Sequence, residues 1–217
     1  MSQEFTVRLR GRTLAVTEAM RKAVMDEMPE IDWIADEALR TKVLNAWAAA
    51  LASGGFNRLG DLKPSGNYDT MPLVSGTQAD HIRSVARLAV AMADEMASLF
   101  PGFTYDRDLL IAGAICHDIG KVWEFDPENV ERWNEAPSHA GLPSIRHPAY
   151  GVHICMTLEL PEAVAHIAGA HSAEGDLIRR SLENTIVHWA DISFWRLAEA
   201  GGQVSTVDTW VPPRKAG

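Results

Sequence analysis

The sequence predicts an all-α protein, a helical bundle with an N-terminal helical extension. Apolar residues recur at helical spacing through most of the 217 residues. Glycine or proline interrupts the apolar pattern where several of the expected helices end. Apolar residues make up 47% and charged residues 23% of the chain, a balance typical of a globular protein. A chain of this length can bury a sizeable core without disulfides or other cross-links.

The first 75 residues contain one short β segment and two helices. Partial alternation of apolar and polar residues over 5–16 predicts a short hairpin or a single strand. A helix follows over 17–28, with Thr17 as its N-cap and Pro29 ending the pattern. A second helix, rich in Ala and Leu, is expected over 33–53.

Further helices alternate with two irregular segments. Residues 54–76 and 122–146 are rich in turn-forming residues, and long connections of this kind are often functional. Pro212 and Pro213 lie in a C-terminal tail that we expect to be a loop or a frayed strand. The helical pattern predicts helices over residues 77–99, 106–118, 148–158, 161–171 and 176–200.

Charge and cysteine content exclude several classes of protein. There are 20 Lys and Arg against 29 Asp and Glu, so the formal net charge is −9. A negative surface disfavours nucleic-acid polymers and anionic membranes, although a bound metal would still allow a small phosphorylated substrate. The two cysteines, Cys116 and Cys155, form no disulfide framework and favour a cytoplasmic location. No apolar stretch approaches about 20 residues, and we expect neither a membrane span nor a signal peptide.

Histidines and aspartates at helix ends form the clearest chemical pattern. All eight histidines lie between positions 81 and 188. Four histidines and two aspartates stand in settings typical of metal ligands. These settings are the first turn of a helix, the end of an apolar helix, the position before a proline and the interior of an apolar helix. These candidate metal ligands are His81, His117, Asp118, His147, His171 and Asp191. A carboxylate inside an apolar helix needs a partner or a metal, because burying it alone is costly.

The kinds of ligand atom limit which metals the site could bind. Imidazole and carboxylate together suit Fe, Mn, Ni, Co or Zn, and these donors do not distinguish among the five metals. A carboxylate can also bridge two metals. Two cations about 3.5–4 Å apart can stabilise an oxyanion and generate a hydroxide nucleophile. We therefore expect a divalent metal at these residues.

The order of the motifs resembles a known family. The segments DHIRSVARLAV, LLIAGAICHDIGK, HPAYGVHI, LPEAVAHIAGAHSAEG and IVHWAD are similar, in this order, to the HD-domain superfamily of metal-dependent phosphohydrolases. The similarity covers roughly residues 77–200. It implies an HD-type metal-binding domain over 76–200, a mostly helical N-terminal extension over 1–75, and a tail over 201–217.

The resemblance also implies roles for individual residues. Its first metal would be held by His81, His117, Asp118 and Asp191. Asp118 would bridge to a second metal held by His147 and His171, so the resemblance implies two divalent ions per chain. The resemblance places Asp118 and Lys121 in catalysis, with Lys121 contacting the phosphate or acting as an acid. For Arg83 and Arg146 the open alternatives are a phosphate contact and a solvated or ion-paired side chain.

Three functions remain open, and the first of them is favoured. It is hydrolysis of a small phosphate ester or nucleotide by a metal-activated hydroxide. The second is a mixed-valent di-iron oxygenase of the same superfamily that cleaves a C–C or C–P bond; in those enzymes a Gln often follows the first His, whereas Ile82 to Val85 follow it here. The third is a ligand sensor without catalysis, which the complete ligand set disfavours. The N-terminal extension could form a homodimer or cover the site.

Several other residues carry two interpretations. Tyr68 and Asp69 form a turn or a substrate gate, and the segment between His117 and His147 forms a lid or a substrate pocket. His188, three residues before Asp191, could orient a ligand. We expect packing roles for Cys116, Trp189, Phe194 and Trp195. The remaining histidines are expected not to bind metal: His139, His153 and His166.

Overall fold

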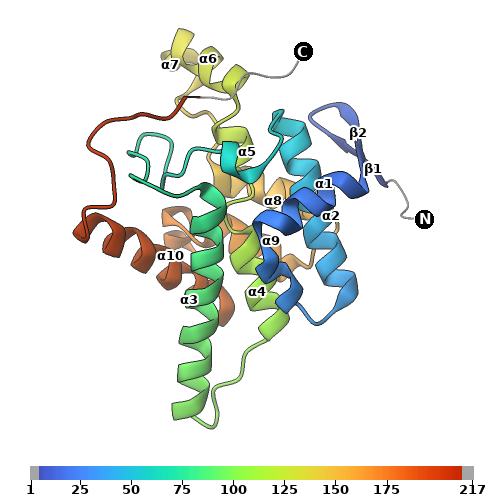
Figure 1. Cartoon of the computed structure of the whole chain (residues 1–217), viewed down its shortest axis with the longest axis vertical. Coiled ribbons are helices and arrows are strands. Elements are labelled where there is room, and N and C mark those ends of the chain that lie inside the picture. The colour runs from blue at the N-terminus through green and yellow to red at the C-terminus, as the bar shows by residue number, and fades with distance from the viewer. Residues whose placement is uncertain (1–4, 212–217) are drawn as a thin grey trace.

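Helices packed around one apolar core dominate the computed structural model, which describes residues 5–211. The expected all-α class is confirmed, and the only β structure in this range is a hairpin and one isolated bridge. Figure 1 shows the long helix α3 running through the molecule, with the N-terminal helices on one side and α10 on the other. The helices are α1 (Glu18–Glu27), α2 (Glu37–Gly54), α3 (Gln78–Leu99), α4 (Arg107–Cys116), α5 (Lys121–Glu124), α6 (Pro127–Glu135), α7 (Pro137–Ala140), α8 (His147–Thr157), α9 (Glu162–Ala170) and α10 (Leu182–Ala200).

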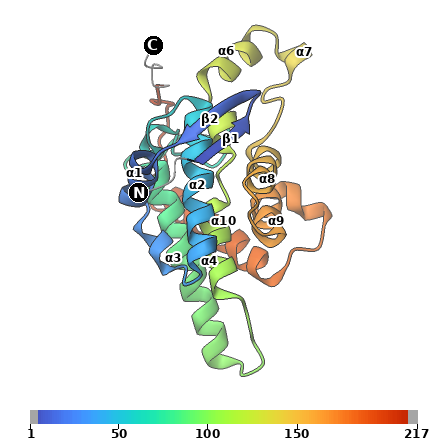
Figure 2. The ribbon, with the colours of Figure 1, turned by 90° about the vertical axis from the view of Figure 1, so that its right-hand side faces the viewer.

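The N-terminal β segment is a hairpin rather than a single strand. Strands β1 (Phe5–Leu9) and β2 (Arg12–Val16) pair antiparallel with Leu9 opposite Arg12. The two turn residues, Arg10 and Gly11, have φ angles of 53° and 73°, the left-handed conformation that a tight hairpin turn requires. Figure 2 shows the hairpin lying across one end of α2.

Helix α2 joins the N-terminal extension to the rest of the core. The Asp36 side chain caps it by accepting from the backbone N–H groups of Ala38 and Leu39, and Gly55 ends it with a φ of 72°. Trp47 is fully buried, and its Nε1 donates to the Ile115 carbonyl of α4 at 3.1 Å. The first 75 residues therefore pack directly on the helix that carries His117.

The remaining bundle brings distant segments together. Helix α8 packs on α9, and α3 packs on both α4 and α10. At Gly113 of α4, an added Cβ would lie 2.2 Å from Ile167 Cδ1 and 3.2 Å from Ile167 Cβ of α9, so a larger residue would force the Ile167 side chain to move. The ends of α3, α4, α8 and α9 and the middle of α10 meet around one point, which becomes the site described below.

Two predicted stretches differ from the structure. Residues 122–146 were expected to be irregular, but they contain most of α5 and all of α6 and α7, because Pro127 and Pro137 begin helices rather than interrupting them. Helix α10 begins at Leu182 instead of residue 176, since Ser181 caps it and a short 3-10 turn, Ala173–Leu177, comes before it.

The C-terminal tail runs beside the long connection after α2. Val204 forms a bridge with Leu73, and Lys63 pairs with Asp208 at 2.6 Å. Pro212 and Pro213 lie outside the described residues. The long connection is therefore held at one side of the bundle by a segment from the other end of the chain.

Candidate metal centre

Five helices contribute the six predicted metal ligands to one buried point. The first turn of α3 carries His81, and the end of α4 carries His117 and Asp118. His147 begins α8, His171 follows α9, and Asp191 lies within α10. The four histidines and Asp118 are 0–3% exposed, and the Asp191 side chain is 14% exposed. Residues 110 positions apart in the sequence are thus brought within reach of one another.

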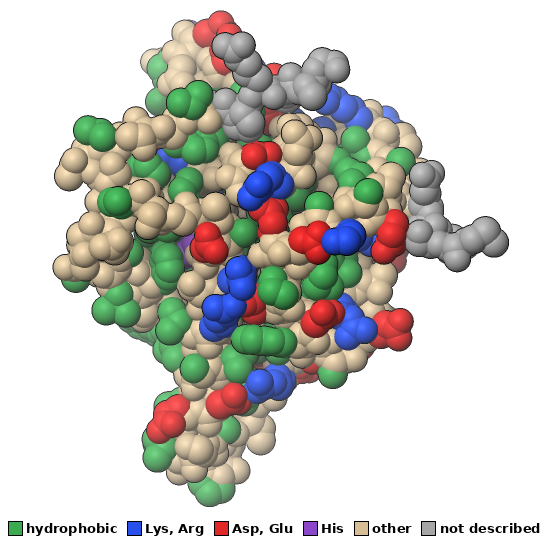
Figure 3. All heavy atoms as spheres, viewed as in Figure 1, with side chains coloured by type: hydrophobic (Ala, Val, Ile, Leu, Met, Phe, Trp, Pro, Cys, Tyr) green, Lys and Arg blue, Asp and Glu red, His purple; other side chains and the backbone are tan. Residues whose placement is uncertain are grey.

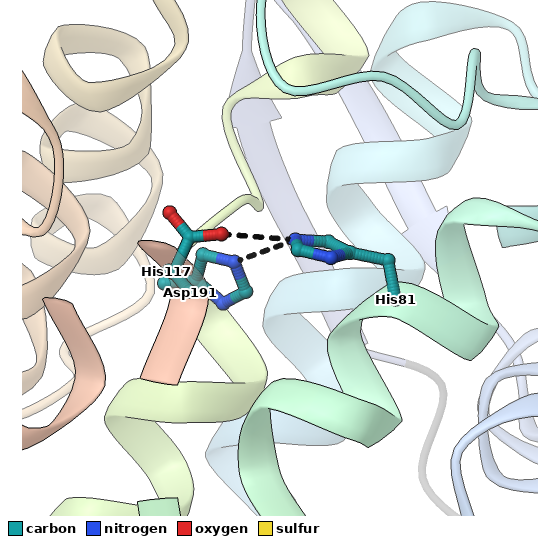
Figure 4. A group of neighbouring side chains, drawn as sticks. All are labelled: His81, His117 and Asp191. Carbon is teal, nitrogen blue, oxygen red and sulfur yellow. Dashed lines mark hydrogen bonds and ion pairs between the residues drawn. The ribbon is translucent and has the colours of Figure 1, made fainter. Parts of the chain in front are cut away.

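One group of donors centres on His81. Its Nε2 lies 3.2 Å from Nε2 of His117 and 3.4 Å from Oδ1 of Asp191. Figure 4 shows the three side chains converging from α3, α4 and α10. The three donor atoms lie within 4.8 Å of one another, close enough to share one metal ion. Oδ1 of Asp191 is buried and has no hydrogen-bond partner among the described residues. A buried carboxylate oxygen without a hydrogen bond is suited to binding a cation.

Asp118 lies between two pairs of histidines. Its Oδ2 is 3.2 Å from His81 Nε2 and 3.3 Å from His117 Nε2. Its Oδ1 is 3.3 Å from His147 Nε2 and 3.7 Å from His171 Nε2. Each carboxylate oxygen therefore faces one pair, which is the arrangement of a ligand that bridges two metals.

Three of the histidine rings are oriented by partners on their outer side. Nδ1 of His117 donates to the Ala114 carbonyl at 2.6 Å, and Nδ1 of His171 to the Ala168 carbonyl at 3.1 Å. Nδ1 of His147 donates to Glu124 Oε2 at 2.5 Å. Carbonyls and carboxylates only accept, so Nδ1 carries the proton and Nε2 presents its lone pair to the centre.

The electrostatics of the centre suit a divalent cation. Burial lowers the pKa of His81 and of His171, which keeps both imidazoles neutral and able to coordinate. Burial acts to raise the pKa of Asp118, but Lys121 and His117 outweigh it and hold that pKa well below its usual range. The neutral imidazoles of His81 and His171 and the ionised carboxylate of Asp118 are donors that fit a metal of the Fe, Mn, Ni, Co or Zn group. Burial acts to lower the pKa of His117, but the negative charge of Asp118 outweighs it and raises that pKa.

A cavity of about 370 Å³ opens beside this cluster. His147, His171 and Asp191 form part of its wall, so a ligand in the cavity would reach the candidate metal ligands. The remaining wall mixes polar and apolar side chains from the long connection, the residue before α8, the 3-10 turn Ala173–Leu177, α10 and the tail. It includes Asn67, Thr70, Met71, Arg146, Asp176, His188, Ile192, Trp195 and Val204.

A family model, described as the HD domain, matches residues 79–193. This range is more than half of the chain and contains all six candidate ligands. The chain belongs to the HD domain family. The family resemblance expected from the sequence is confirmed, and the HD domain is a helical fold, in agreement with the bundle.

One curated relative of this HD domain protein is the dihydroneopterin 2′,3′-cyclic phosphate phosphodiesterase of Methanocaldococcus jannaschii. It is 29% identical over 117 residues, which are 54% of this chain and 45% of the relative. The chain thus spans less than half the length of that curated relative. No solved structure matches the chain significantly.

Lys121 lies inside the HD site rather than at its surface. It is fully buried, and its Nζ lies 2.9 Å from Asp118 Oδ2 and donates to the Ser65 carbonyl. It is not among the residues that line the cavity. The structure therefore brings Lys121 to Asp118 rather than to the wall of the cavity.

The two predicted substrate arginines occupy different places in the HD domain. Arg146 lines the cavity and donates to Glu124, Glu174 and Asn67 at 3.1, 2.9 and 2.7 Å. Arg83 does not line it; its Nε lies 2.9 Å from Oε2 of buried Glu30. Of the two alternatives for Arg83, the structure therefore shows an ion pair.

Two further HD-site residues were missed by sequence reasoning. Nε2 of buried Gln78 donates to Asp118 Oδ2 at 2.7 Å, and Glu124 accepts from His147. The Thr77 capping box indicates that Gln78 begins the helix one turn before His81. The sequence shows that Glu124 follows Lys121 by about one helical turn, but no local pattern indicates that Glu124 faces His147.

Other expectations for this HD domain have mixed outcomes. Trp189 is 52% exposed, so its predicted place in the core is wrong, because it lies on the outer face of α10. Cys116 is buried as expected.

His188 lines the cavity, and its Nδ1 donates to the His171 carbonyl at 2.5 Å. Tyr68 lies in a turn and packs on Phe125 and Trp133, and none of these three lines the cavity.

No helix within residues 5–211 is long and apolar enough to cross a membrane. On the face drawn in Figure 3, acidic side chains lie beside basic ones instead of leaving a basic field. The comparisons give no support for the expected homodimer.

Proposed function

We propose that this HD domain protein is a metal-dependent phosphohydrolase that acts on a small phosphate ester. One observation carries the proposal: the two oxygens of Asp118 face two separate histidine pairs, beside a cavity that contains an arginine. A bridging carboxylate next to an anion-binding group is the arrangement that hydrolysis of a phosphate ester needs. The family match and the phosphodiesterase relative support the same class of reaction.

The donor distances support a proposal of two metal positions. The first would use His81, His117, Asp118 and Asp191, and the second would use Asp118, His147 and His171. The groups His81–His117–Asp191 and His117–Asp118–His171 each have donor atoms within 4.8 Å of one another, and His147 would join the second position with its Nε2 3.3 Å from Asp118 Oδ1. Divalent metals bound there supply Lewis acidity and lower the pKa of a coordinated water.

Side chains of the protein itself would bind the substrate phosphate and hold the Asp118 carboxylate in place. Arg146 presents a guanidinium to the cavity, and such a group binds phosphate oxygens in a bidentate manner. Lys121 and Gln78 both donate to Asp118 Oδ2 and hold the carboxylate in place. Lys121 therefore acts through Asp118, and Arg146 is the better candidate for the contact with substrate.

The size and charge of the site limit the substrate. A cavity of about 370 Å³ is at the small end of ligand pockets. The net charge of −9 disfavours a nucleic-acid polymer. The M. jannaschii relative is named for a cyclic phosphate of a pterin. We therefore favour a nucleotide-sized phosphate ester or cyclic phosphodiester.

Asp118→Asn tests the proposal directly. The amide keeps the volume of the carboxylate but removes the charge that both metals would share. We expect metal content, measured by elemental analysis, and hydrolysis of bis(4-nitrophenyl) phosphate and of 2′,3′-cyclic nucleotides to fall at least 100-fold together. Asp176→Asn, which also changes a carboxylate in the cavity wall, should keep its metal. A fully metallated and active Asp118→Asn enzyme would contradict the site.

Metal identity separates the hydrolase from the di-iron oxygenase that the sequence left open. A hydrolase should turn over phosphate esters without oxygen, with any of the non-redox metals of the group. An oxygen-dependent reaction, together with the electron paramagnetic resonance signal of a mixed-valent iron pair, would support the oxygenase instead.

A further inference from the structure

Glu124, the last residue of α5, has an unusual set of partners. It is fully buried and accepts four hydrogen bonds from three residues. Oε2 accepts from the backbone N–H of His147 at 2.7 Å and from its Nδ1 at 2.5 Å. Oε1 accepts from Arg146 Nη1 and from the backbone N–H of Tyr68, both at 3.1 Å.

These four donors use the full capacity of the carboxylate. An ionised carboxylate only accepts, with about four lone-pair positions on its two oxygens. All four contacts of Glu124 are with N–H donors, which is the environment that an ionised carboxylate requires. A neutral amide would instead point hydrogens at some of these donors.

His147 differs from the other ring-oriented ligands in its outer partner. His117 and His171 donate to backbone carbonyls within their own helices. His147 donates to a side chain from another helix, 23 positions away. Its orientation toward Asp118 Oδ1, at 3.3 Å, therefore depends on a residue that can be replaced without changing the backbone.

The same carboxylate also holds the wall of the cavity. Arg146 bonds to Glu124 with one nitrogen and to Asn67 with another, at 2.7 Å. Tyr68 bonds to Glu124 through its backbone, so the long connection and Arg146 share one anchor. One side chain thus connects a candidate metal ligand with the candidate phosphate-binding arginine.

We propose that Glu124 is a positioning residue that sets His147 for the second metal and Arg146 for the phosphate at the same time. The inference rests on the proposed metal centre and phosphohydrolase function. It predicts that the second metal and the binding of phosphate are lost together when Glu124 is changed, whereas the first metal, held by His81, His117 and Asp191, is retained.

Glu124→Gln is the variant of choice, because it keeps the shape of the side chain. We expect metal content to fall from about two ions to about one per chain. In zinc or manganese titrations, the affinity of the weaker site should fall about 10- to 100-fold, the usual effect of losing an outer partner of a ligating histidine. Binding of inorganic phosphate to the metal-loaded protein, measured by calorimetry, should weaken as well.

Glu174→Gln is the matched control. Glu174 also pairs with Arg146, at 2.9 Å, but has no bond to His147. It should keep both metals. Circular dichroism and the melting temperature of each metal-free variant report whether the fold is intact.

A double variant distinguishes positioning from general support. If Glu124 acts through His147, then Glu124→Gln combined with His147→Ala should bind the same amount of metal as His147→Ala alone. A purely structural role would lower metal content further, and that result would overturn the inference.

Other results separate the inference from the proposed function. A Glu124→Gln protein that binds two metals with wild-type affinity overturns the inference, as does a wild-type protein that binds no second metal. If the wild type binds two metals but hydrolyses no phosphate ester, and Glu124→Gln still loses one metal and phosphate affinity, the positioning role stands and the proposed function fails.

Discussion

Buried charged side chains in the described part of this protein have partners of opposite charge or hydrogen-bond partners. Lys121 pairs with Asp118, Glu124 with His147 and Arg146, and Glu30 with an arginine pair outside the site. Removing one partner from such a group leaves the other unsatisfied, which costs more than the pair itself contributes. Conservative substitutions therefore report on individual contacts.

Glu30→Gln should destabilise the protein by about 1–3 kcal/mol at pH 7. Glu30 is 2% exposed and pairs with Arg83 and Arg87 of α3. Burial acts to raise its pKa, but the hydrogen bonds from both arginines outweigh it and bring the pKa below the ordinary 4.5. Chemical denaturation at pH 7 measures the loss, and Glu95→Gln, on the exposed part of α3, should change stability by less than about 0.5 kcal/mol.

The pH dependence of that difference follows from its sign. A carboxyl whose pKa is lowered by folding stabilises the protein above its unfolded pKa, and this contribution disappears as the pH falls through the folded pKa. The difference between wild type and Glu30→Gln should therefore be constant above pH 4.5 and shrink below it. A difference that grew on acidification would contradict the ion pair.

Whole elements are positioned by close backbone approaches as much as by side chains. At Gly120, between the His-Asp pair and α5, a Cβ would lie 1.9 Å from the His147 carbonyl oxygen and 2.6 Å from the Gly151 nitrogen. Both atoms are backbone and cannot rotate away. The glycine lets α5 pack directly on α8, which carries His147 and sets Glu124 beside it.

Gly120→Ala should cost at least about 2 kcal/mol and displace α8. The displacement would move His147 away from Asp118, so metal content should fall together with the melting temperature. Gly102→Ala is the matched control, because a Cβ there meets nothing within 4 Å. Equal stability of the two variants would show that α8 can shift at little cost.

At the scale of the whole molecule, the candidate ligands link helices from the middle and the end of the chain. His81 and Asp191 are 110 positions apart, and each comes from a different helix of the bundle. A cation that binds only this folded arrangement stabilises it by mass action. Metal binding and global stability should therefore be coupled.

Removal of the metal should lower the melting temperature. At a free metal concentration about 100-fold above the dissociation constant, one site contributes about 2.7 kcal/mol. For a chain of this size that corresponds to roughly 5–10 °C. Differential scanning calorimetry with and without chelator measures the shift, and Asp118→Asn should show none. An equal shift in that variant would place the metal elsewhere.

The helices of this protein and its candidate metal ligands could be predicted from the sequence alone. The helices carry their own end signals, such as Asp36 before α2 and Ser181 before α10, and their apolar spacing is local. The six candidate ligands could be named because each stands in a short motif at a helix end or within an apolar helix. Local patterns of this kind need no knowledge of what packs against them.

Tertiary structure alone decided which of these groups face one another. Whether Arg83 or Arg146 reaches the cavity depends on Glu30, 53 positions before Arg83, and on Asn67, 79 positions before Arg146. Gln78 and Glu124 join the site only because α3 and α5 meet α4 and α8 around Asp118 and His147. Lys121, next to a motif expected to meet substrate, is instead enclosed by Ser65 and Asp118. Burial and ion pairing are properties of distant neighbours, and those neighbours are set by packing rather than by the local pattern of residues.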